Sequence, residues 1–573
     1  MKEEKWIYRR PPELSLKVAE RFGIEPVTAA ILLNRGLNSI REIREYLYGG
    51  TECFHDPFLL KDMDRACAVL QKKISEQAKI RIVGDYDIDG IMSSYILKRG
   101  LRELGAEADI RIPHRISDGY GMNLTMIDEA VRDGIDTIIT CDNGISASDV
   151  AEYANEHGIT MVVTDHHDVV SIPHAEAVID PQRPDDAYPN KNICGAGVAW
   201  KLIRALGGDP QMRMLQYVGF ATVGDVVDLT GENRIFVREG LQQLRDTDNT
   251  GLRRLAEVCG CSLGKIDTYH IGFVLGPCMN ASGRLDSAMR ALELLECESD
   301  QRARDIAEDL KSLNESRKAM TVQAETEAVH MIENGEFGND RVLVLYMPAL
   351  HESIAGIVAG RIREKYGKPV FILTKGEEAV KGSGRSIEGY SMAGELQKVK
   401  SLLLRFGGHP MAAGLSLDFG NVERLREALN RECTLSDEDL VPKIRMDALV
   451  PVAEITEKLV SEMELLGPFG KGNPKPLFCE KNAFCEHPRL FGAQHNFMKM
   501  RIRSLTDPRD IDPGRPGFQP SLTGSQIDAV CFRDVDRLYR RVTDNPVVSI
   551  IYEAGFDEYM GERRIQAVIR HFR

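Results

Sequence analysis

The chain has 573 residues, of which 43% are hydrophobic and 28% are charged, and these are the proportions of a water-soluble globular protein. This length exceeds what a single core supports, so we expect about three or four domains. The formal net charge of −14 argues against a molecule coated with basic surface, although a local basic groove remains compatible with it. The 12 cysteines include no CxxC pair, which argues against a zinc knuckle or a disulfide framework. No run of about 18 apolar residues occurs, so we expect a cytoplasmic protein with reduced thiols and no membrane contact.

The N-terminal part of the chain reads as helices with polar connections. Residues 29–33 form an apolar cluster typical of a buried helix, and the stretch RGLNSIREIREYL predicts another. We interpret residues 1–78 as an N-terminal helical segment that packs against the rest of the chain.

Residues 81–90, RIVGDYDIDG, predict a buried strand that turns into a helix at Gly90. Three carboxylates, those of Asp85, Asp87 and Asp89, lie within five residues of one another. Like charges repel, and burial adds to the penalty, so a divalent cation would relieve the cost of holding them together. The alternative is a polar turn that caps a helix.

Two later stretches repeat this pattern of an apolar strand followed by metal-type ligands. DTIITCDNGIS ends its strand at Asp142, and TMVVTDHHD ends its strand at Asp165, His166 and His167. In open α/β sheets, ligands bind outside the carboxyl ends of the strands. Three neighbouring parallel strands would therefore bring all these side chains to one crevice. A lone histidine pair is more often structural, but three strand ends with the same chemistry favour a metal site.

The region from residue 79 to about residue 251 alternates strands and helices, as expected of a mainly parallel sheet. His114 and Arg115 follow one predicted strand, where they could meet a phosphate or lie in an ordinary surface loop. Asp225 follows an apolar stretch and could supply a further carboxylate to the crevice.

A charged segment from residue 299 to about residue 335 has apolar residues at the helical period, which predicts a long connecting helix. A second α/β unit begins near residue 341. Its KGSGRS loop displays Arg385 and Ser386 among glycines, where backbone N–H groups and a guanidinium could hold a phosphate. FGGHPMAAG displays Gly408 and His409 ahead of a helix expected to start at residues 412–413, a pattern typical of an anion site.

The C-terminal part of the chain, from residue 447 onwards, favours β structure. Met498, Met500 and Ile502 alternate with basic residues, which predicts a strand with one apolar face and one basic face. A solvated strand face is the alternative interpretation.

Taken together, these motifs resemble a known superfamily. GDYDIDG, TCDNG, TDHH and VGDVVD are similar to the four successive motifs of DHH phosphoesterases, and GGHPMAAG is similar to the glycine-rich motif of the DHH-associated domain. The segments CGAGVAWKL, GPCMNASGRL, LHESIAGIVAGRI, KGSGRS and LLGPFGKGNPKPLF narrow the resemblance to the RecJ family of single-strand-specific exonucleases. The resemblance covers nearly the whole chain.

The resemblance implies an α/β fold with a two-lobed core and a C-terminal barrel. A parallel-sheet DHH catalytic domain at 79–298 would be joined by a connecting helix at 299–335 to a DHH-associated α/β domain at 336–440. An oligonucleotide-binding (OB-like) β-barrel would occupy 441–573, after the N-terminal segment at 1–78.

The resemblance also implies roles for the candidate site residues. Asp142 would bridge two metal ions, Asp85 and His167 would support catalysis, and Asp165 would support the ligands. Asp228 stands where the family usually has a proline, so we do not expect it to be a ligand. The expected metal ligands are Asp87, Asp89, Asp142, His166 and Asp225. The expected nucleic-acid and phosphate contacts are His114, Arg115, Arg284, Arg385, Ser386, Gly408 and His409.

Carboxylate and imidazole ligands suit Mn²⁺ or Mg²⁺, and the number of candidates exceeds the needs of one ion, so we expect two. The resemblance further implies an exonuclease that degrades single-stranded DNA from the 5′ end to 5′ mononucleotides in recombination and repair. By family analogy, its partners would be single-stranded DNA, a single-strand-binding protein and a RecQ-type helicase. The alternatives are a DHH enzyme for cyclic dinucleotides or very short oligonucleotides, and a noncatalytic DNA-tethering protein.

Overall fold

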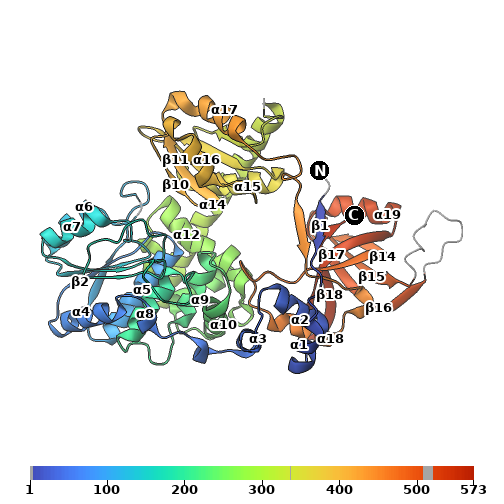
Figure 1. Cartoon of the computed structure of the whole chain (residues 1–573), viewed down its shortest axis with the longest axis horizontal. Helices are drawn as coiled ribbons and strands as arrows, with labels where there is room; N and C mark the ends of the chain where they lie inside the picture. The colour runs from blue at the N-terminus through green and yellow to red at the C-terminus, as the bar shows by residue number, and fades with distance from the viewer. Residues whose placement is uncertain (1–3, 120, 336, 507–520, 560) are drawn as a thin grey trace. The chain divides into compact units, whose positions relative to one another are not determined.

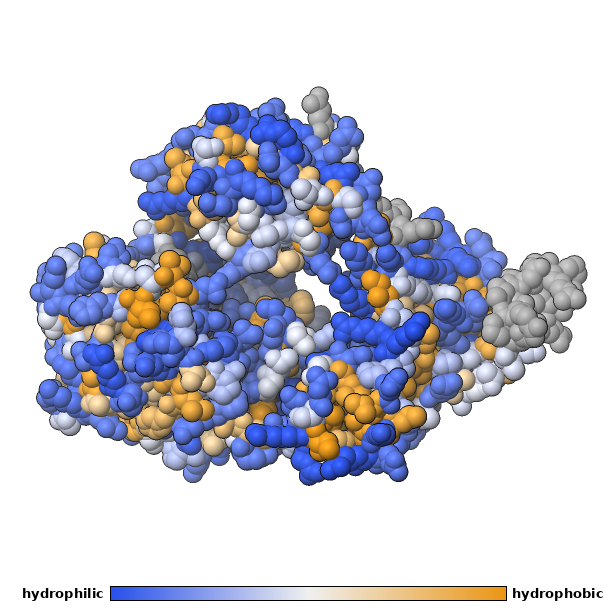
Figure 2. Space-filling view, in the orientation of Figure 1, coloured by the Kyte–Doolittle hydropathy of each residue, from blue (hydrophilic) through white to orange (hydrophobic). Residues whose placement is uncertain are grey.

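The computed structural model describes every residue except 1–3, 120, 336, 507–520 and 560. Its contacts divide the chain into two compact units (Figure 1). The first unit contains residues 55–227 and 239–442, and the second contains residues 5–54, 228–238 and 443–573. Among the described residues, no helix is long and apolar enough to cross a membrane. The face drawn in Figure 2 is mostly hydrophilic, with apolar residues in separate patches.

The first sheet of the first unit has five parallel strands in the order β3-β2-β4-β5-β6. The strands are β2 (Ile80–Val83), β3 (Ala108–Arg111), β4 (Thr137–Cys141), β5 (Thr160–Thr164) and β6 (Ala177–Ile179). Strands β2, β4 and β5 lie at the three apolar runs that precede the candidate metal ligands. The chain leaves β2 for β3 on one side and returns to β4 on the other, so a topological switch point lies between β2 and β4.

Helices cover both faces of this sheet, as right-handed crossovers between parallel strands require. One face carries α6 (Leu124–Asp133) and α7 (Ser148–Glu156), whose apolar residues share a core with β2, β4 and β5. The other face carries α4 (Met63–Ser75), α5 (Ile88–Glu103) and α8 (Gly195–Ala205) (Figure 1). Further helices complete this part: α9 (Leu215–Gly224), α11 (Thr250–Val258), α12 (Gly276–Leu285) and α13 (Met289–Glu296). Helix α10 (Gly231–Arg245) is divided between the units, with residues 231–238 in the second and 239–245 in the first.

A single helix of 35 residues, α14 (Asp300–Asn334), connects this part to a second sheet and confirms the predicted connecting helix. The second sheet has the order β10-β11-β9-β8-β7. The strands are β7 (Leu343–Tyr346), β8 (Val370–Lys375), β9 (Val380–Arg385), β10 (Arg405–Gly408) and β11 (Ala412–Leu417). Its helices are α15 (Ala355–Tyr366), α16 (Met392–Lys398) and α17 (Val422–Glu432).

Two local expectations for this sheet are wrong. KGSGRS, expected as a loop, forms most of strand β9, and residues 412–413, expected to start a helix, start strand β11. A Cβ at Gly382 would lie 2.4 Å from a side-chain carbon of Leu373, and one at Gly384 would lie 2.6 Å from the Phe371 ring. The glycines therefore make room for large side chains of the neighbouring strand β8. Glycine content lowered the predicted strand tendency, but packing across the sheet decides the outcome.

The second unit contains a closed five-strand barrel, which confirms the predicted OB-like fold class. Its strands run in the order β14-β15-β16-β18-β17, and β14 pairs with β17 to close it. They are β14 (Phe478–Phe491), β15 (Phe497–Leu505), β16 (Leu522–Cys531), β17 (Val547–Tyr559) and β18 (Glu562–Phe572). Short strand β13 (Ala448–Leu449) and helices α18 (Glu457–Leu465) and α19 (Val535–Asp544) complete it.

The N-terminal helices α1 (Ser15–Phe22), α2 (Pro26–Asn34) and α3 (Ile40–Tyr48) belong to the same unit as the barrel. Buried residues such as Ile31 and Leu32 share one core with the barrel strands. The Thr28 hydroxyl donates to the Glu462 carboxylate, and β1 (Lys5–Tyr8) pairs in parallel with β12 (Lys443–Met446). The structure thus divides the predicted N-terminal segment between the units, with 5–54 in the second and 55–78 in the first.

Candidate metal centre

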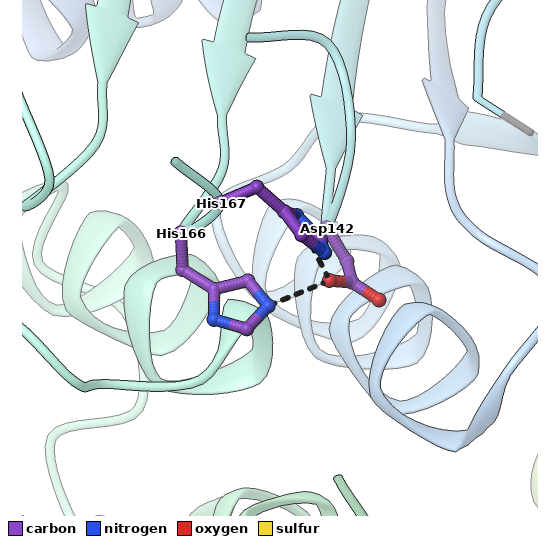
Figure 3. Close-up of side chains that lie close together, drawn as sticks. All are labelled: Asp142, His166 and His167. Atoms are coloured by element: carbon purple, nitrogen blue, oxygen red, sulfur yellow. Dashed lines mark hydrogen bonds and ion pairs between the residues drawn. The ribbon is translucent and has the colours of Figure 1, made fainter. Parts of the chain in front are cut away.

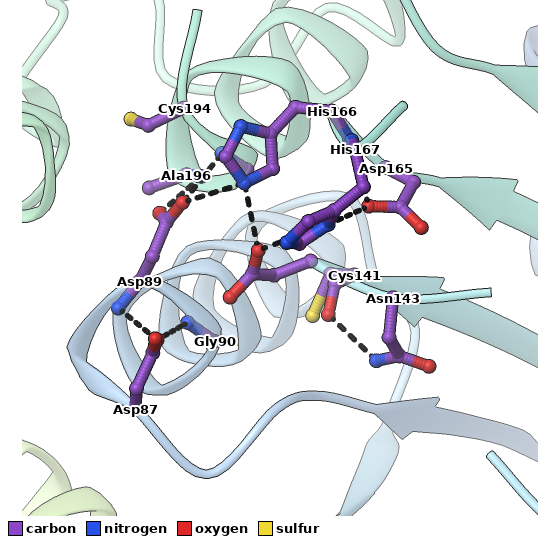
Figure 4. Close-up of polar contacts among 12 residues, drawn as sticks. Asp87, Asp89, Gly90, Cys141, Asn143, Asp165, His166, His167, Cys194 and Ala196 are labelled. Carbon is purple, nitrogen blue, oxygen red and sulfur yellow. Dashed lines mark hydrogen bonds and ion pairs between the residues drawn. The ribbon is translucent and has the colours of Figure 1, made fainter. Parts of the chain in front are cut away.

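The carboxyl ends of β2, β4 and β5 meet at the switch point of the first sheet. The Asn143 amide joins two of these ends, because its Nδ2 donates to Val83 O of β2 at 3.0 Å and to Cys141 O of β4 at 2.9 Å. This fully buried asparagine therefore links the two acidic strand ends, and Figure 4 shows its contact with Cys141. Its position directly after Asp142 in the CDNG motif is the one sequence signal that points to this residue.

The DYDIDG turn places three aspartates by backbone geometry. Asp87 is the N-cap of α5, and its carboxylate accepts hydrogen bonds from the backbone N–H groups of Asp89 (2.9 Å) and Gly90 (3.3 Å). A Cβ at Gly90 would lie 2.3 Å from Asp85 O, so the turn can close this tightly only with glycine there. Asp89 lies in the first turn of α5 and is fully buried. Its carboxylate accepts hydrogen bonds from Gly195 N (2.7 Å) and Ala196 N (2.8 Å), the first residues of α8 (Figure 4).

Asp142 lies at the centre of the cluster. Its φ of +60° is unusual for a residue with a Cβ, and such backbone strain is concentrated at functional sites. One carboxylate oxygen lies 2.9 Å from His166 Nε2 and 4.0 Å from His167 Nδ1 (Figure 3). His166 Nε2 also lies 3.5 Å from the Asp89 carboxylate.

Asp165 orients its neighbours. Its Oδ1 lies 2.7 Å from His167 Nδ1 and accepts a hydrogen bond from His166 N at 2.8 Å, and its Oδ2 accepts one from Ile145 N at 2.9 Å (Figure 4). The Nδ1–H of His167 is thereby held toward the carboxylate, and this contact fixes the orientation of the ring. This arrangement is typical of a carboxylate that supports a metal-binding histidine.

Seven side chains supply three groups of donor atoms, each group lying within 4.8 Å: Asp85–Asp87–Asp142, Asp142–His166–His167 and Asp89–His166–Asp225. The groups share Asp142 and His166, which is the geometry expected of neighbouring ions with a common ligand. The last member, Asp225, lies at the C-terminal end of α9. All seven residues come from the sequence-predicted set.

The electrostatics of the cluster favour bound cations. Burial raises the pKa of Asp142, and the charges of Asp89, Asp87 and Asp85 raise it further. Burial and the Asp87 charge likewise raise the pKa of Asp85, whose Oδ1 is buried and has no hydrogen-bond partner among the described residues. An orphaned carboxylate oxygen and a set of oxygen and imidazole donors without thiolate fit Mn²⁺ or Mg²⁺.

The two histidines differ in protonation. Burial lowers the pKa of His166, so its imidazole is neutral near pH 7 and can bind a metal. Burial alone would also lower the pKa of His167, but the hydrogen bond and charge of Asp165 raise it to about 9. His167 is therefore a cation next to the acidic cluster in the metal-free protein, where it offsets part of the negative charge.

A basic cavity of about 890 Å³ adjoins the cluster within the first unit. Tyr86, from the DYDIDG turn, lines it, and the Arg115 guanidinium lies 4.6 Å from the centre of that ring. Arg284 Nη1 donates to Ser353 O at 2.8 Å. Arg385 reaches the cavity from the end of β9 and donates to Gly384 O at 2.8 Å. The cavity is also lined by three basic residues that the sequence analysis did not select: Arg361, Lys381 and Arg405.

The guanidinium groups in this cavity, like the carboxylates of the cluster, are buried next to groups of the same charge. Burial, together with the charges of Arg115 and Arg317, lowers the pKa of Arg284 to about 10. Burial and the charge of Arg363 lower the pKa of Arg385. A bound anion such as a phosphate would offset the burial and the like-charge repulsion of these arginines. The planar guanidinium group can donate two parallel hydrogen bonds to such an anion.

Four of the sequence-predicted phosphate contacts do not line this cavity. Ser386 is buried, and its hydroxyl donates to Tyr390 O, so it holds the turn after β9. His114 is exposed outside the lining, and His409 is exposed with its Nδ1 3.2 Å from the Asp168 carboxylate. Gly408 has a φ of +140°, and a Cβ there would lie 2.4 Å from Ala412 O. The glycine is thus needed by the β10–β11 turn itself.

Three family models match this chain. The DHH family N-terminal domain matches residues 79–224, the DHHA1 domain matches residues 339–434, and the RecJ OB domain matches residues 446–512. Together they cover both sheets of the first unit and part of the barrel.

Curated relatives match over nearly the whole chain. The single-stranded-DNA-specific exonuclease RecJ of Bacillus subtilis is 34% identical over 99% of this chain and 70% of that protein. The protein of the same name from Dickeya dadantii is 32% identical over 98% of both chains, and that of Escherichia coli is 31% identical over 95% of both.

Solved structures agree with these matches. The structure of Thermus thermophilus RecJ in complex with Mn²⁺ superposes with a TM-score of 0.82 at 26% identity, over 99% of this chain and 79% of that one. An exonuclease RecJ bound to manganese is 32% identical, with a TM-score of 0.58 over 66% of this chain and 96% of that one. Motifs, fold and strand-end cluster lead to the same conclusion: the chain belongs to the RecJ family of the DHH phosphoesterases.

Proposed function

We propose that the chain is a metal-dependent exonuclease that degrades single-stranded DNA in the 5′-to-3′ direction and releases 5′ mononucleotides. The observation that carries the proposal is the pairing of an acidic, histidine-containing cluster with a basic cavity on the same unit. The first has the donors for divalent cations, and the second has the donors for phosphates. Cleavage of a phosphodiester next to a terminal phosphate requires both.

Each residue of the cluster has a proposed role. Asp87, Asp89, Asp142, His166 and Asp225 would hold two ions, with Asp142 shared between them. A bound pair of Mn²⁺ or Mg²⁺ ions would supply a hydroxide nucleophile at neutral pH and neutralise charge on the leaving oxygen.

The remaining members of the cluster would act on the substrate and on the ligands. Asp85, buried and raised in pKa, would complete the coordination or hold a proton at its free Oδ1. His167, held through Nδ1 by Asp165, would present Nε2–H to an oxygen of the scissile phosphate. In the metal-free protein, the hydrogen bond and charge of Asp165 raise the pKa of His167 to about 9, so the ring is protonated at neutral pH before the ions bind.

The cavity would set the direction of attack. Arg385, Arg284 and Arg115 would hold a 5′-terminal phosphate, and the scissile bond of the first nucleotide would then lie at the metal centre. Positioning of this kind converts binding energy into rate, because the reacting groups meet already aligned.

We propose that residues 79–298 form the catalytic domain and that residues 336–440 bind the phosphates of the substrate. Residues 441–573 would bind the single strand. The basic side chains of Lys499, Arg501 and Arg503 on β15 support the last of these. Asp528 lies 3.3 Å from Lys499 and 3.8 Å from Arg501, so part of this positive charge is already balanced. The partners would be single-stranded DNA and, by family analogy, a single-strand-binding protein and a RecQ-type helicase acting in recombination and repair.

An end-labelled single strand tests the function. With Mn²⁺ present, a strand labelled at its 5′ phosphate should release labelled mononucleotide at once, whereas a 3′-labelled strand should release it only at the end of digestion. A blunt duplex of the same sequence is the control and should persist. Release from the 3′ label first would refute the direction, and rapid hydrolysis of a cyclic dinucleotide with an intact long strand would favour the small-substrate alternative.

A further inference from the structure

Two thiols from different helices lie in contact near the metal centre. Cys259 follows the C-terminal end of α11 and Cys278 lies in α12, and their Sγ atoms are 3.7 Å apart. Both are free thiols in the structure. A disulfide bond joins sulfurs at about 2.05 Å, so the two would have to approach by about 1.6 Å to become bonded.

The surroundings make the pair asymmetric. Cys278 is buried, and its sulfur accepts a hydrogen bond from Asn314 Nδ2 of α14 at 3.3 Å. The contact with Cys259 lowers the pKa of Cys278, and the same contact raises the pKa of Cys259. Cys259 is only partly buried and is followed by the exposed Gly260. A small oxidant can therefore reach the Cys259 sulfur, which lies in contact with the buried Cys278 sulfur.

A metal site does not explain the pair. The observed sulfur separation of 3.7 Å also suits two thiolates on one zinc ion, but such a site needs four ligands. In the part of the chain that the structure describes, no group of three metal-type side chains includes either cysteine. The nearby Cys261 thiol faces Cys259 O at 3.9 Å.

Helix α12 connects this pair to the metal centre. Two residues after Cys278, the Asn280 side-chain oxygen accepts a hydrogen bond from Ile88 N at 2.8 Å, between Asp87 and Asp89. One turn later, a Cβ at Gly283 would lie 2.2 Å from Tyr86 O, which shows how closely α12 approaches the DYDIDG turn. The next residue, Arg284, lines the basic cavity.

We propose that Cys259 and Cys278 are a reversible oxidation site whose disulfide form shifts α12 and suppresses the activity of the metal centre. The oxidant is of the peroxide class: two thiols and one hydrogen peroxide give one disulfide and two waters. The S–O bond of a sulfenic acid forms first, and the second thiolate then displaces hydroxide as water when the S–S bond forms. A dithiol reductant reverses the step.

The size of the required movement sets the expected effect. A disulfide would tie α12 to the end of α11, and α12 carries both Asn280, which accepts the hydrogen bond from Ile88 N, and Arg284, which lines the cavity. A displacement of about 1 Å at an active site costs up to about 100-fold in rate. The expected loss of activity rests on the proposed nuclease function, whereas the formation of the disulfide does not.

The test compares the full chain before and after treatment with hydrogen peroxide in the absence of metal, followed by removal of the oxidant. Peptide mapping after alkylation should show one new disulfide between the peptides of Cys259 and Cys278. Release of nucleotides from single-stranded DNA should fall by about 10- to 100-fold and return on addition of dithiothreitol. Cys259→Ser should resist the loss, and Cys261→Ser, two residues away, should lose activity as the unaltered chain does.

Three results would overturn the proposal: no disulfide at this pair, a disulfide at this pair with unchanged activity, or equal loss of activity in Cys259→Ser. If the reduced chain shows no nuclease activity, the proposed function fails. In that case, the effect of the disulfide is read from Mn²⁺ affinity by calorimetry, and unchanged affinity in the cross-linked chain would still refute the link to the metal centre.

Discussion

The acidic cluster and the basic cavity of the first unit carry opposite charges, yet both are destabilised in the same way. Burial and neighbouring carboxylates raise the pKa of Asp142, and burial with neighbouring guanidiniums lowers the pKa of Arg284 to about 10. A bound ligand of the opposite charge would therefore stabilise each region. The difference lies in construction. Most of the cluster follows strand ends that the fold brings together, with Asp225 added from the end of α9, whereas the cavity draws single basic residues from positions as distant as Arg115 and Arg405.

This difference teaches that a site is predictable from sequence when its residues are contiguous. Six of the seven cluster residues lie in short motifs in which the strand, the turn and the ligand are adjacent, and so they could be selected together, whereas Asp225 follows an apolar stretch that forms helix α9. In the cavity, Arg361 and Lys381 carry no local pattern that separates them from surface charges. Only the packing of α15 against β9 brings them to one wall.

The largest expected effect is on the cluster. Asp142→Asn keeps the side-chain shape, and asparagine tolerates the φ of +60°, so the fold should be preserved. Loss of the shared carboxylate should lower nuclease turnover by more than about 100-fold, because even a group that only supports a metal ligand contributes 10- to 100-fold. Turnover is measured as release of acid-soluble nucleotide at saturating DNA. A variant with unimpaired melting temperature and turnover within about 2-fold of the parent would contradict the metal assignment.

The cavity should show a selective effect. Arg385→Gln should reduce the preference for a 5′-phosphorylated strand over a 5′-hydroxyl strand by about 10- to 100-fold in kcat/KM, since a charge-assisted hydrogen bond contributes about 1.5–3 kcal/mol. The neighbouring Ser386→Ala is the matched control. The Ser386 hydroxyl is buried and donates to Tyr390 O, so its removal should lower the free energy of unfolding by about 1 kcal/mol. The preference for a 5′-phosphorylated strand should not change. Loss of the preference in the serine variant alone would reverse the assignment.

A pH series separates the two regions. The pKa values of Asp85, Asp89 and Asp142 are raised, so these carboxyls keep their protons to a higher pH than ordinary aspartates and compete with cations there. Mn²⁺ affinity should therefore weaken as the pH falls, and it should begin to weaken at a higher pH than for ordinary aspartate ligands. Arginines in the cavity stay charged throughout the series, so Mn²⁺-free binding of a 5′-phosphorylated strand should weaken less. Calorimetric titrations at each pH measure both, and a flat Mn²⁺ affinity would be inconsistent with buried carboxylate ligands.

The smallest expected effect concerns salt. Arg405→Gln removes one basic residue from the cavity wall, so the slope of log KM against log salt should decrease by about 0.7 for a single strand. Turnover at saturating DNA should not change. The measurement is KM at several KCl concentrations, with Arg424→Gln on α17 as an exposed control of equal charge change. Equal slopes in the parent and Arg405→Gln would place the strand outside the cavity.

The fold was predictable where the spacing of apolar residues along the sequence determines the element. It was not predictable where contacts between distant segments determine it. The five strands of the first sheet and the 35-residue helix α14 follow the apolar pattern directly. The turn and strand around Gly408 differ from the expected helix start because the glycine is needed for close approach to β11. No local signal shows that Thr28 of α2 meets Glu462 of α18, at the opposite end of the chain. For this reason the N-terminal helices were not assigned to the unit that contains the barrel.

The most direct test of the account is to locate Mn²⁺ itself. Crystals of the chain soaked in Mn²⁺ should give two anomalous scattering peaks at the carboxyl ends of β2, β4 and β5. The two peaks should lie about 3.5–4 Å apart, with the Asp142 carboxylate bound to both ions. Peaks elsewhere, or ordered Asp142 and His166 side chains with no peak between them, would contradict it.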